Sequence, residues 1–294
     1  MSFFDGFERR RVRTRDADLS VVTGGSGPPL LLLHGYPQNR VMWHAVAPRL
    51  ANQCSLVIPD LRGYGDSLGP GPDVDHATYS KRVMAQDAAD LMTAFGHARF
   101  FVAGHDRGGR VAYRLALDRP DRVARLALLD ILPTFDVWDR MDHRAALGSY
   151  HWLFLAQPAP TPERLIGADP DYFLRHLLDR WAGRPDALDR AAVAEYARHF
   201  RKPSVIEATC EDYRAGASVD LEHDRADRHA GRRVQCPTLL LWGRRYLRPK
   251  SAWPLDIWRP WADDIRDVSL DCGHFLAEEQ PEAVAAALAE FFQA

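Results

Sequence analysis

The sequence predicts an α/β fold in which a mostly parallel sheet is flanked by helices and carries an inserted helical cap. Two observations lead to this prediction. Short apolar runs alternate with helical patterns over most of the 294 residues, and such alternation is typical of a parallel sheet covered on both faces. Between Pro133 and Cys236, by contrast, helical patterns and turn signals follow one another without a convincing strand.

Six apolar runs are predicted to be buried parallel strands. Short runs of apolar and partly β-branched residues favour strands that are buried on both faces. The predicted strands are Pro29–His34, Leu56–Pro59, Arg99–His105, Val123–Asp130, Pro237–Trp242 and Ile265–Leu270.

Helical patterns separate these runs. Tyr79–Phe95 has apolar residues at three- and four-residue spacings, which predicts one apolar helix face. Val111–Leu117 continues as a helix after a glycine pair, and Pro281–Phe292 is an alanine-rich closing helix with proline in its first turn.

The stretch without strands predicts a separate helical cap. We expect a core domain of residues 1–132 and 237–294 and a cap domain of residues 133–236. An insertion at this point would cover the carboxyl edge of the sheet, where open α/β sheets bind ligands, and it could exclude water from a reaction. The predicted cap helices are Met141–Ala156, Thr161–Gly183, Ala187–Phe200 and Val205–Ala217.

Composition and charge exclude several classes of protein. The chain has 38 basic and 40 acidic residues, so its net charge of −2 points to neither nucleic acid nor an anionic membrane. Its longest apolar run is far shorter than the ~20 residues that cross a bilayer, and Met1–Arg15 has no apolar signal segment. The cysteines show no C-x-x-C spacing, which favours reduced thiols in a cytoplasmic protein.

The segment that carries the chemistry follows the predicted strand Arg99–His105. Gly104-His-Asp-Arg-Gly108 has the frame of the G-x-S-x-G nucleophile elbow, with Asp106 in the serine position. The turn exposes Asp106 at the start of a helix, whose dipole favours the ionised carboxylate. Such a carboxylate can attack carbon and form an ester. For a lone aspartate before two glycines, helix capping would be the favoured interpretation, so the nucleophile role depends on its partners.

A histidine and a second acid supply those partners. His274 lies between the last predicted strand and the last helix, and hence above the sheet. Asp130 ends a strand and is assigned as the acid that orients His274, which gives the chain order nucleophile, acid, histidine. Asp136 and Asp256 are alternatives, but each lies several residues past a strand end.

Together these motifs resemble α/β-hydrolase-fold enzymes of the epoxide hydrolase and dehalogenase branch. Within that branch they are most similar to the fluoroacetate dehalogenase family, because Arg107 follows Asp106 where epoxide hydrolases and haloalkane dehalogenases usually have tryptophan. The resemblance implies a homodimer and a hydrolase of small haloacetates. The supporting segments are His34-Gly-Tyr-Pro37, Asp60-Leu-Arg-Gly-Tyr-Gly-Asp-Ser67, the Asp106 elbow and Cys272-Gly-His-Phe275.

The resemblance also implies which residues bind the substrate. Asp106, Arg107 and Arg110 match the family pattern Asp-Arg-x-x-Arg, in which the arginines hold the substrate carboxylate. Guanidinium groups suit that task because they bind carboxylates with two parallel hydrogen bonds. Arginine is common in this chain, since only three of its 38 basic residues are lysines, so this spacing alone is weak support.

Three cap residues match the family's halide-binding positions, namely His151, Trp152 and Tyr213. Their imidazole N–H, indole N–H and phenol O–H are neutral donors that can stabilise a leaving halide. Simple aromatic packing is the alternative for the His151-Trp152 pair. Trp181 is a further pocket-lining candidate, although a large aromatic residue is more often part of a core.

The loop Arg244-Arg245-Tyr246-Leu-Arg248 departs from the family pattern. It is bulkier and more basic than expected at this position, and it contains no acid. We expect it to reshape the pocket entrance or a dimer surface.

The expected mechanism has two steps. Asp106 displaces the halide from the α-carbon, and water activated by His274 then hydrolyses the ester at the Asp106 carboxyl carbon. Backbone N–H groups of Tyr36 and Arg107 would bind the oxyanion. This chemistry needs no metal or organic cofactor, and the sequence contains no ligand-spaced cluster or phosphate-binding glycine loop.

Other functions remain open at this stage. An epoxide hydrolase would share Asp106 and His274 and would need two cap tyrosines, Tyr213 with Tyr150 or Tyr172. A chloro- or bromoacetate dehalogenase with weak C–F activity would use the same residues as a defluorinase. A binding protein on this fold would usually lack the nucleophile or the base, and neither is missing here.

Overall fold

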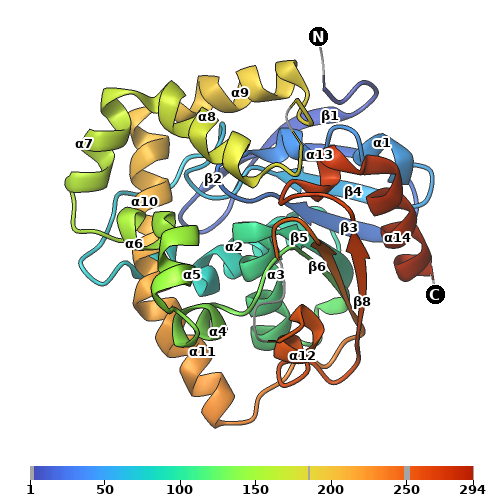
Figure 1. Cartoon of the computed structure of the whole chain (residues 1–294). Helices are drawn as coiled ribbons and strands as arrows, with labels where there is room; N and C mark the ends of the chain where they lie inside the picture. The colour runs from blue at the N-terminus through green and yellow to red at the C-terminus, as the bar shows by residue number, and fades with distance from the viewer. Residues whose placement is uncertain (1–2, 185, 248–251, 294) are drawn as a thin grey trace.

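One eight-stranded sheet organises the molecule (Figure 1). The computed structural model describes residues 3–184, 186–247 and 252–293. The strands lie in the order β1-β2-β4-β3-β5-β6-β7-β8. The β1–β2 and β2–β4 pairs are antiparallel, and the remaining neighbours in the sheet are parallel. The prediction of a mostly parallel sheet is therefore confirmed.

The six predicted strands form the parallel part of the sheet, close to the predicted bounds. Their apolar side chains are almost all buried because helices cover both faces. Only β8 at the far edge is mostly half-buried. The six strands are β3 (Pro29–Leu33), β4 (Ser55–Pro59), β5 (Phe100–His105), β6 (Val123–Leu129), β7 (Thr238–Gly243) and β8 (Ile265–Leu270).

Two N-terminal strands are absent from the prediction. β1 (Glu8–Arg13) is an exposed edge strand made mostly of arginines, so it contains no apolar run. Charged residues are typical of edge strands because they discourage pairing with other chains. β2 (Asp18–Gly25) is only partly buried and ends in two glycines, which weakens its signal.

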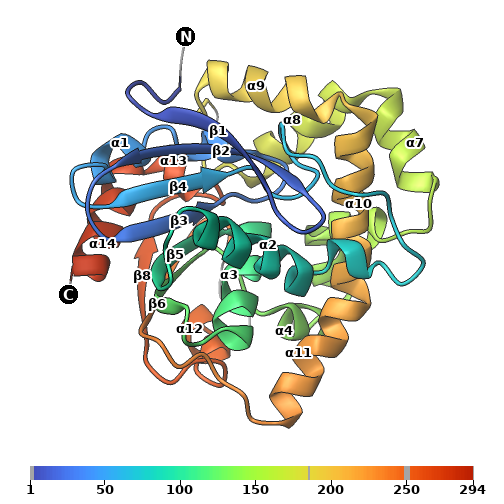
Figure 2. The same cartoon turned by 180° about the vertical axis from the view of Figure 1, so that it is seen from behind.

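Helices cover both faces of the sheet (Figure 1, Figure 2). On one face, α2 (Lys81–Ala94) packs against α3 (Asp106–Asp118). On the other face, α1 (Ala47–Leu50) packs against α14 (Pro281–Gln293). The shorter helical elements outside the cap are η1 (Arg40–Trp43), η2 (Ala77–Tyr79), α12 (Pro254–Trp258) and α13 (Leu276–Glu279).

The insertion between β6 and β7 is helical, as predicted. Two of the predicted cap segments are each split into two helices, and the split at Asp169 has a clear cause. Pro170 begins a new helix there, and the Asp169 side chain caps it by accepting the Tyr172 N–H at 2.9 Å. The cap helices are α4 (Thr134–Asp139), α5 (His143–Gly148), α6 (Tyr150–Leu155), α7 (Thr161–Ala168), α8 (Pro170–Trp181), α9 (Arg190–Phe200), α10 (Pro203–Ala217) and α11 (Val219–His229).

The sequence patterns predict neither α4 nor α11. Most residues of α11 are charged, so its sequence has no clear apolar stripe. Several of its acids are nevertheless buried, and two of them contact residues of α3: Asp224 accepts the Tyr113 hydroxyl at 2.7 Å, and Asp227 pairs with Arg114. Polar contacts with the core therefore hold this helix, and a pattern of apolar residues cannot reveal them.

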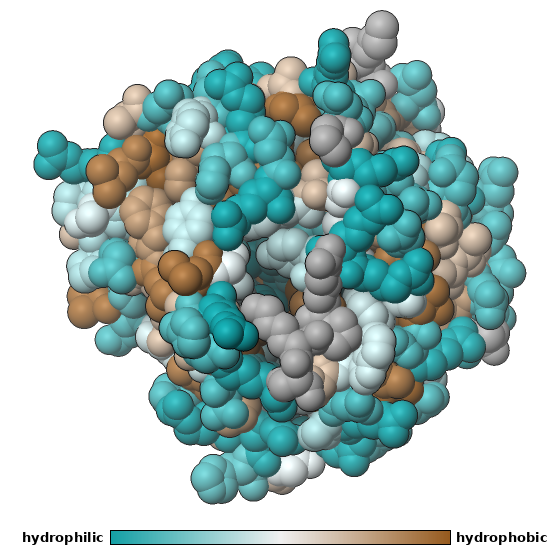
Figure 3. Space-filling view, in the orientation of Figure 1, coloured by the Kyte–Doolittle hydropathy of each residue, from teal (hydrophilic) through white to brown (hydrophobic). Residues whose placement is uncertain are grey.

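The cap lies against the carboxyl ends of the parallel strands. A direct contact shows this. His274 lies in the loop after β8, and its backbone N–H donates to the backbone carbonyl of Trp181, at the end of α8, over 2.9 Å. In Figure 3 the surface is hollowed near the centre of the face, between the cap helices and the core loops. Within the three described ranges, no helix combines the length and the apolar character needed to cross a bilayer.

Candidate active site

Asp106 lies at a sharp turn between β5 and α3. Its φ of +47° is in the left-handed region, which is strained for a residue other than glycine. The neighbouring glycines are required by packing: a Cβ on Gly108 would collide with the backbone of Leu33 and His34, and one on Gly35 would collide with the Asp106 side chain. This geometry is that of a nucleophile elbow.

His274 and Asp130 meet beside Asp106. His274 Nδ1 lies 2.6 Å from an Asp130 carboxylate oxygen, and its Nε2 lies 3.8 Å from Asp106 Oδ2. The other Asp130 oxygen accepts the Gly243 N–H at 2.8 Å. With Nδ1 donating to Asp130, Nε2 carries the lone pair, and among the described residues it has no hydrogen-bond partner. A histidine in this state can act as a general base toward a water molecule near Asp106.

The alternative acids have other partners. Asp136 accepts the indole N–H of Trp261 at 2.7 Å, and Asp256 lies 3.6 Å from Arg259 on the surface. Of the three aspartates that the sequence offers, the structure brings Asp130 to His274.

The surroundings of Asp106 favour its ionised form. Burial by itself would raise the pKa of this carboxyl, but His274, His105 and the adjacent arginines lower it below its ordinary value. Oδ1 also accepts the backbone N–H of Tyr36 at 2.8 Å. That N–H is one of the two predicted oxyanion donors, and it lies next to the carboxyl group at which water would attack. The second predicted donor, the Arg107 N–H, belongs to the residue that follows Asp106 in the elbow.

Arg107 lies in the site, but most of its guanidinium already has a partner. Nε and Nη2 bind the Asp212 carboxylate over 2.5 to 3.1 Å, and both residues are fully buried. Nη1 has no hydrogen-bond partner among the described residues. The expectation that Arg107 presents a free two-pronged fork is therefore corrected, because only Nη1 remains for a ligand.

Arg110 is the less compensated cation. Nη1 donates to the Leu132 carbonyl at 3.0 Å and to the Thr134 hydroxyl at 2.9 Å, and Nε has no hydrogen-bond partner within the described ranges. No carboxylate of the described chain forms an ion pair with Arg110, and burial together with the neighbouring Arg107 lowers its pKa. Its guanidinium carbon lies 4.4 Å from the ring centre of Trp152. A buried arginine without an acid is costly unless an anion joins it.

The three predicted halide donors pack against one another. His151 and Trp152 come from α6 and Tyr213 from α10, and both rings lie within 5.8 Å of the Tyr213 ring centre. Burial lowers the pKa of His151 to about 3, so its imidazole is neutral at physiological pH. Burial likewise keeps Tyr213 a phenol, since its pKa lies well above the ordinary value.

Aromatic residues from the cap and the core also pack against His274. Trp181 lies between His151 at 4.5 Å and His274 at 5.5 Å, ring centre to ring centre. Tyr246, from the loop that departs from the family pattern, lies 4.4 Å from His274. The sequence singles out this loop without assigning Tyr246 a position, and its contact with His274 is visible only in the structure. Arg248 of the same loop lies outside the described residues.

Of the two tyrosines that the sequence offers as the second donor of an epoxide hydrolase, Tyr172 is 63% exposed and stacks on His176. Tyr150 packs against both His176 and His151, with ring centres 5.9 and 6.3 Å apart. Tyr36 also lies close to Tyr213, with its ring centre 5.2 Å away and its hydroxyl buried without a partner among the described residues.

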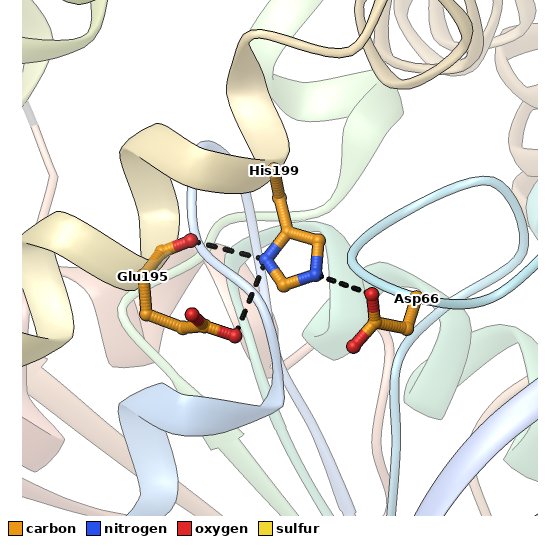
Figure 4. Close-up of side chains that lie close together, drawn as sticks. All are labelled: Asp66, Glu195 and His199. Atoms are coloured by element: carbon orange, nitrogen blue, oxygen red, sulfur yellow. Dashed lines mark hydrogen bonds and ion pairs between the residues drawn. The ribbon is translucent and has the colours of Figure 1, made fainter. Parts of the chain in front are cut away.

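One cluster outside this site brings metal-type ligand atoms together (Figure 4). His199 of α9 lies between two carboxylates, with Nε2 2.8 Å from Asp66 and Nδ1 3.6 Å from Glu195. Arg198 and Lys202 also pair with Asp66, at 3.4 and 3.2 Å. Because these cations already neutralise the acids, the cluster is better suited to joining cap and core than to holding a metal ion.

Comparisons with known proteins agree with this fold. A model of the α/β hydrolase fold family matches residues 28–281, and the chain belongs to that family. A crystal structure from Nostoc sp. PCC 7120, described as an α/β hydrolase, has a TM-score of 0.96 and 50% identity, covering 99% of both chains.

Two relatives indicate the branch of this family to which the chain belongs. The chain is 47% identical to a fluoroacetate dehalogenase of Burkholderia sp., covering 98% of this chain and 94% of that protein. It is 34% identical to a soluble epoxide hydrolase of Corynebacterium sp. (strain C12), covering 92% of each. The protein is thus a homologue of fluoroacetate dehalogenase, in the branch of α/β hydrolases that also contains epoxide hydrolases.

Proposed function

We propose that the protein is a hydrolytic dehalogenase of small haloacetates, which converts fluoroacetate and water to glycolate, fluoride and a proton. The observation that carries this proposal is the buried guanidinium of Arg110, which has no acidic partner in the described chain and lies near an ionised Asp106. A substrate with a carboxylate would supply the missing anion and would place its α-carbon against the nucleophile. The 47% identity to a fluoroacetate dehalogenase supports the same substrate class.

In the first step, Asp106 attacks the α-carbon of the substrate. A carbon–oxygen bond forms while the carbon–halogen bond breaks, and the halide leaves with the bonding electron pair. His151, Trp152 and Tyr213 stabilise the charge that develops on the halogen. Arg110 and the free Nη1 of Arg107 hold the carboxylate during this step.

In the second step, water hydrolyses the ester at the Asp106 carboxyl carbon. His274 Nε2 takes a proton from the water, and Asp130 stabilises the imidazolium that forms. The N–H groups of Tyr36 and Arg107 bind the oxyanion. His274 then returns the proton to the leaving alkoxide, and the second water proton is released when Asp106 ionises again.

A parallel assay of purified protein tests the proposal. Halide release is measured with fluoroacetate, chloroacetate and bromoacetate, and diol formation is measured with a small epoxide. We expect halide release from the haloacetates and little turnover of the epoxide, because Arg110 gives a neutral epoxide no binding advantage. Epoxide hydrolysis without halide release would assign the site to the other activity of this branch.

Replacing Arg110 with methionine tests the carboxylate-binding role. Methionine keeps much of the apolar stem but removes the charge. We expect kcat/KM for chloroacetate to fall roughly 30-fold or more, mainly through KM, because truncating one partner of a buried charge pair costs at least 2 kcal/mol. Steady-state kinetics measure the change. Arg125→Met, which removes an arginine that donates to a backbone carbonyl, is the matched control. An unchanged KM in Arg110→Met would contradict the role.

Replacing Trp152 with phenylalanine tests the halide donors. Phenylalanine keeps an aromatic ring but lacks the indole N–H. A hydrogen bond to a developing charge is worth about 1.5 to 3 kcal/mol. Because chloride needs less help to leave than fluoride, fluoroacetate should lose about tenfold more kcat/KM than chloroacetate. Trp138→Phe is the control, because Trp138 packs on Trp152 while its own N–H donates to Gly216 at 2.9 Å. Equal losses for both substrates in Trp152→Phe would mean that Trp152 only packs.

A further inference from the structure

A buried carboxylate ties the loop of His274 to the cap. Glu279, at the end of α13, accepts three backbone N–H groups, those of Gly183 at 2.8 Å, Gly273 at 3.0 Å and Phe275 at 3.1 Å. Gly273 and Phe275 flank His274, whereas Gly183 belongs to the cap. One side chain therefore joins both sides of the base to the inserted domain.

The cap segment held in this way also reaches the halide donors. Two residues before Gly183, the Trp181 carbonyl accepts the His274 N–H at 2.9 Å. The Trp181 ring lies 4.5 Å from the His151 ring. A Cβ on Gly183 or Gly273 would collide with the facing backbone, so the two segments are in direct contact. Residues 181–183 thus contact the base on one side and a halide donor on the other.

A second link lies on the surface of the same junction. Arg245 Nη1 donates to the Gly183 carbonyl at 3.0 Å, and the guanidinium pairs with Asp271 at 2.8 Å. Asp271 begins the loop of His274. Cap segment and base loop are therefore joined from inside by Glu279 and from outside by Arg245.

We propose that Glu279 is a positioning residue for ester hydrolysis, the second half of the reaction. This inference rests on the proposed function. Asp130 fixes the ring of His274 at one end, while Glu279 fixes the backbone on both sides of it, and both are needed to direct Nε2 toward a water at the Asp106 ester. The first half requires Asp106, Arg110 and the halide donors but no proton transfer by His274. Loss of Glu279 contacts therefore slows hydrolysis and spares halide release.

Glu279→Gln is the test, because glutamine keeps the size but places an NH₂ group against backbone N–H donors. With chloroacetate, single-turnover halide release should keep the parent rate. Hydrolysis of the ester should slow about tenfold or more, as expected for lost hydrogen bonds to a charged group. Intact-protein mass spectra at steady state should then show a larger fraction of esterified enzyme than in the parent.

Glu278→Gln is a matched control. Glu278 is adjacent and also contacts the cap, through the Tyr196 hydroxyl at 3.0 Å, but its side chain does not bind the base loop. Burial raises the pKa of Glu278 to about 8, so glutamine resembles its predominant protonated form at neutral pH. We expect the ratio of the two step rates in this control to equal that of the parent.

The outcomes separate the two proposals. Parallel slowing of both steps in Glu279→Gln, or no slowing of hydrolysis, overturns the positioning role while leaving the dehalogenase function intact. A parent enzyme that releases no halide overturns both.

If Glu279→Gln does not fold, Arg245→Met breaks the surface link instead, with Arg244→Met as its control, since Arg244 contacts Ser269 rather than Gly183. A shift toward accumulated ester in Arg245→Met alone supports the junction, and equal behaviour of the two variants overturns it.

Discussion

Replacing Asp106 with asparagine should lower steady-state turnover of haloacetates by roughly 10⁴-fold or more, the size of loss seen when an enzyme's covalent nucleophile is removed. The neutral amide has neither the charge nor the basicity needed to displace a halide from carbon. Asparagine keeps the size of the side chain, so the elbow and its packing against Gly35 should persist. Halide release under saturating substrate measures the effect.

Two controls make the Asp106→Asn result specific. Thermal unfolding should show that the variant is folded, and substrate protection against unfolding should show that it still binds haloacetate. The mass of the purified variant must be checked, because deamidation of the new asparagine would restore aspartate. A folded, non-deamidated variant with parent activity would rule out a covalent route through residue 106.

Replacing His274 with asparagine should stop the reaction after the first half. Nε2 lies 3.8 Å from Asp106, and it can take a proton from a water molecule beside that carboxyl group. Each enzyme molecule should release one equivalent of halide and then retain the substrate fragment as an ester. Mass spectrometry of the intact protein should show the added mass of one carboxymethyl group, and peptide mapping should place it on Asp106.

The His274 prediction has a clear counter-result. Release of one equivalent of halide without any adduct would mean that the ester is hydrolysed without His274. Sustained turnover near the parent rate would have the same meaning. Asp130→Asn serves as a graded comparison, since it keeps His274 but disturbs the bond at 2.6 Å that orients it, and we expect slower hydrolysis with partial ester accumulation.

The parallel sheet and the elbow could be predicted from sequence because their signals are local. A buried strand between helices is a continuous apolar run, and the glycines around Asp106 report a sharp turn within a few residues. β1 and α11 escaped prediction for the opposite reason. Their residues are mainly charged, and what holds them in place is pairing with β2 in one case and polar contacts with α3 in the other.

The partners of the candidate site residues could not be predicted in the same way. Spacing placed Arg107 and Arg110 on one side of the elbow but could not show that Asp212, 105 positions further on, occupies most of the Arg107 guanidinium. Glu279 also has no motif, because its three partners are backbone N–H groups. The contacts of Arg107 with Asp212 and of Glu279 with Gly183 form only when the cap packs against the core. They therefore depend on the folded chain.

The most direct measurement of the central claim is a single turnover in ¹⁸O-labelled water with enzyme in excess over chloroacetate. If Asp106 forms the ester and water attacks its carboxyl carbon, the glycolate formed takes its hydroxyl oxygen from Asp106 and carries no label. The ¹⁸O then appears in the peptide that contains Asp106. Labelled glycolate in the first turnover, with unlabelled Asp106, would show that water attacks the substrate directly and would contradict the account.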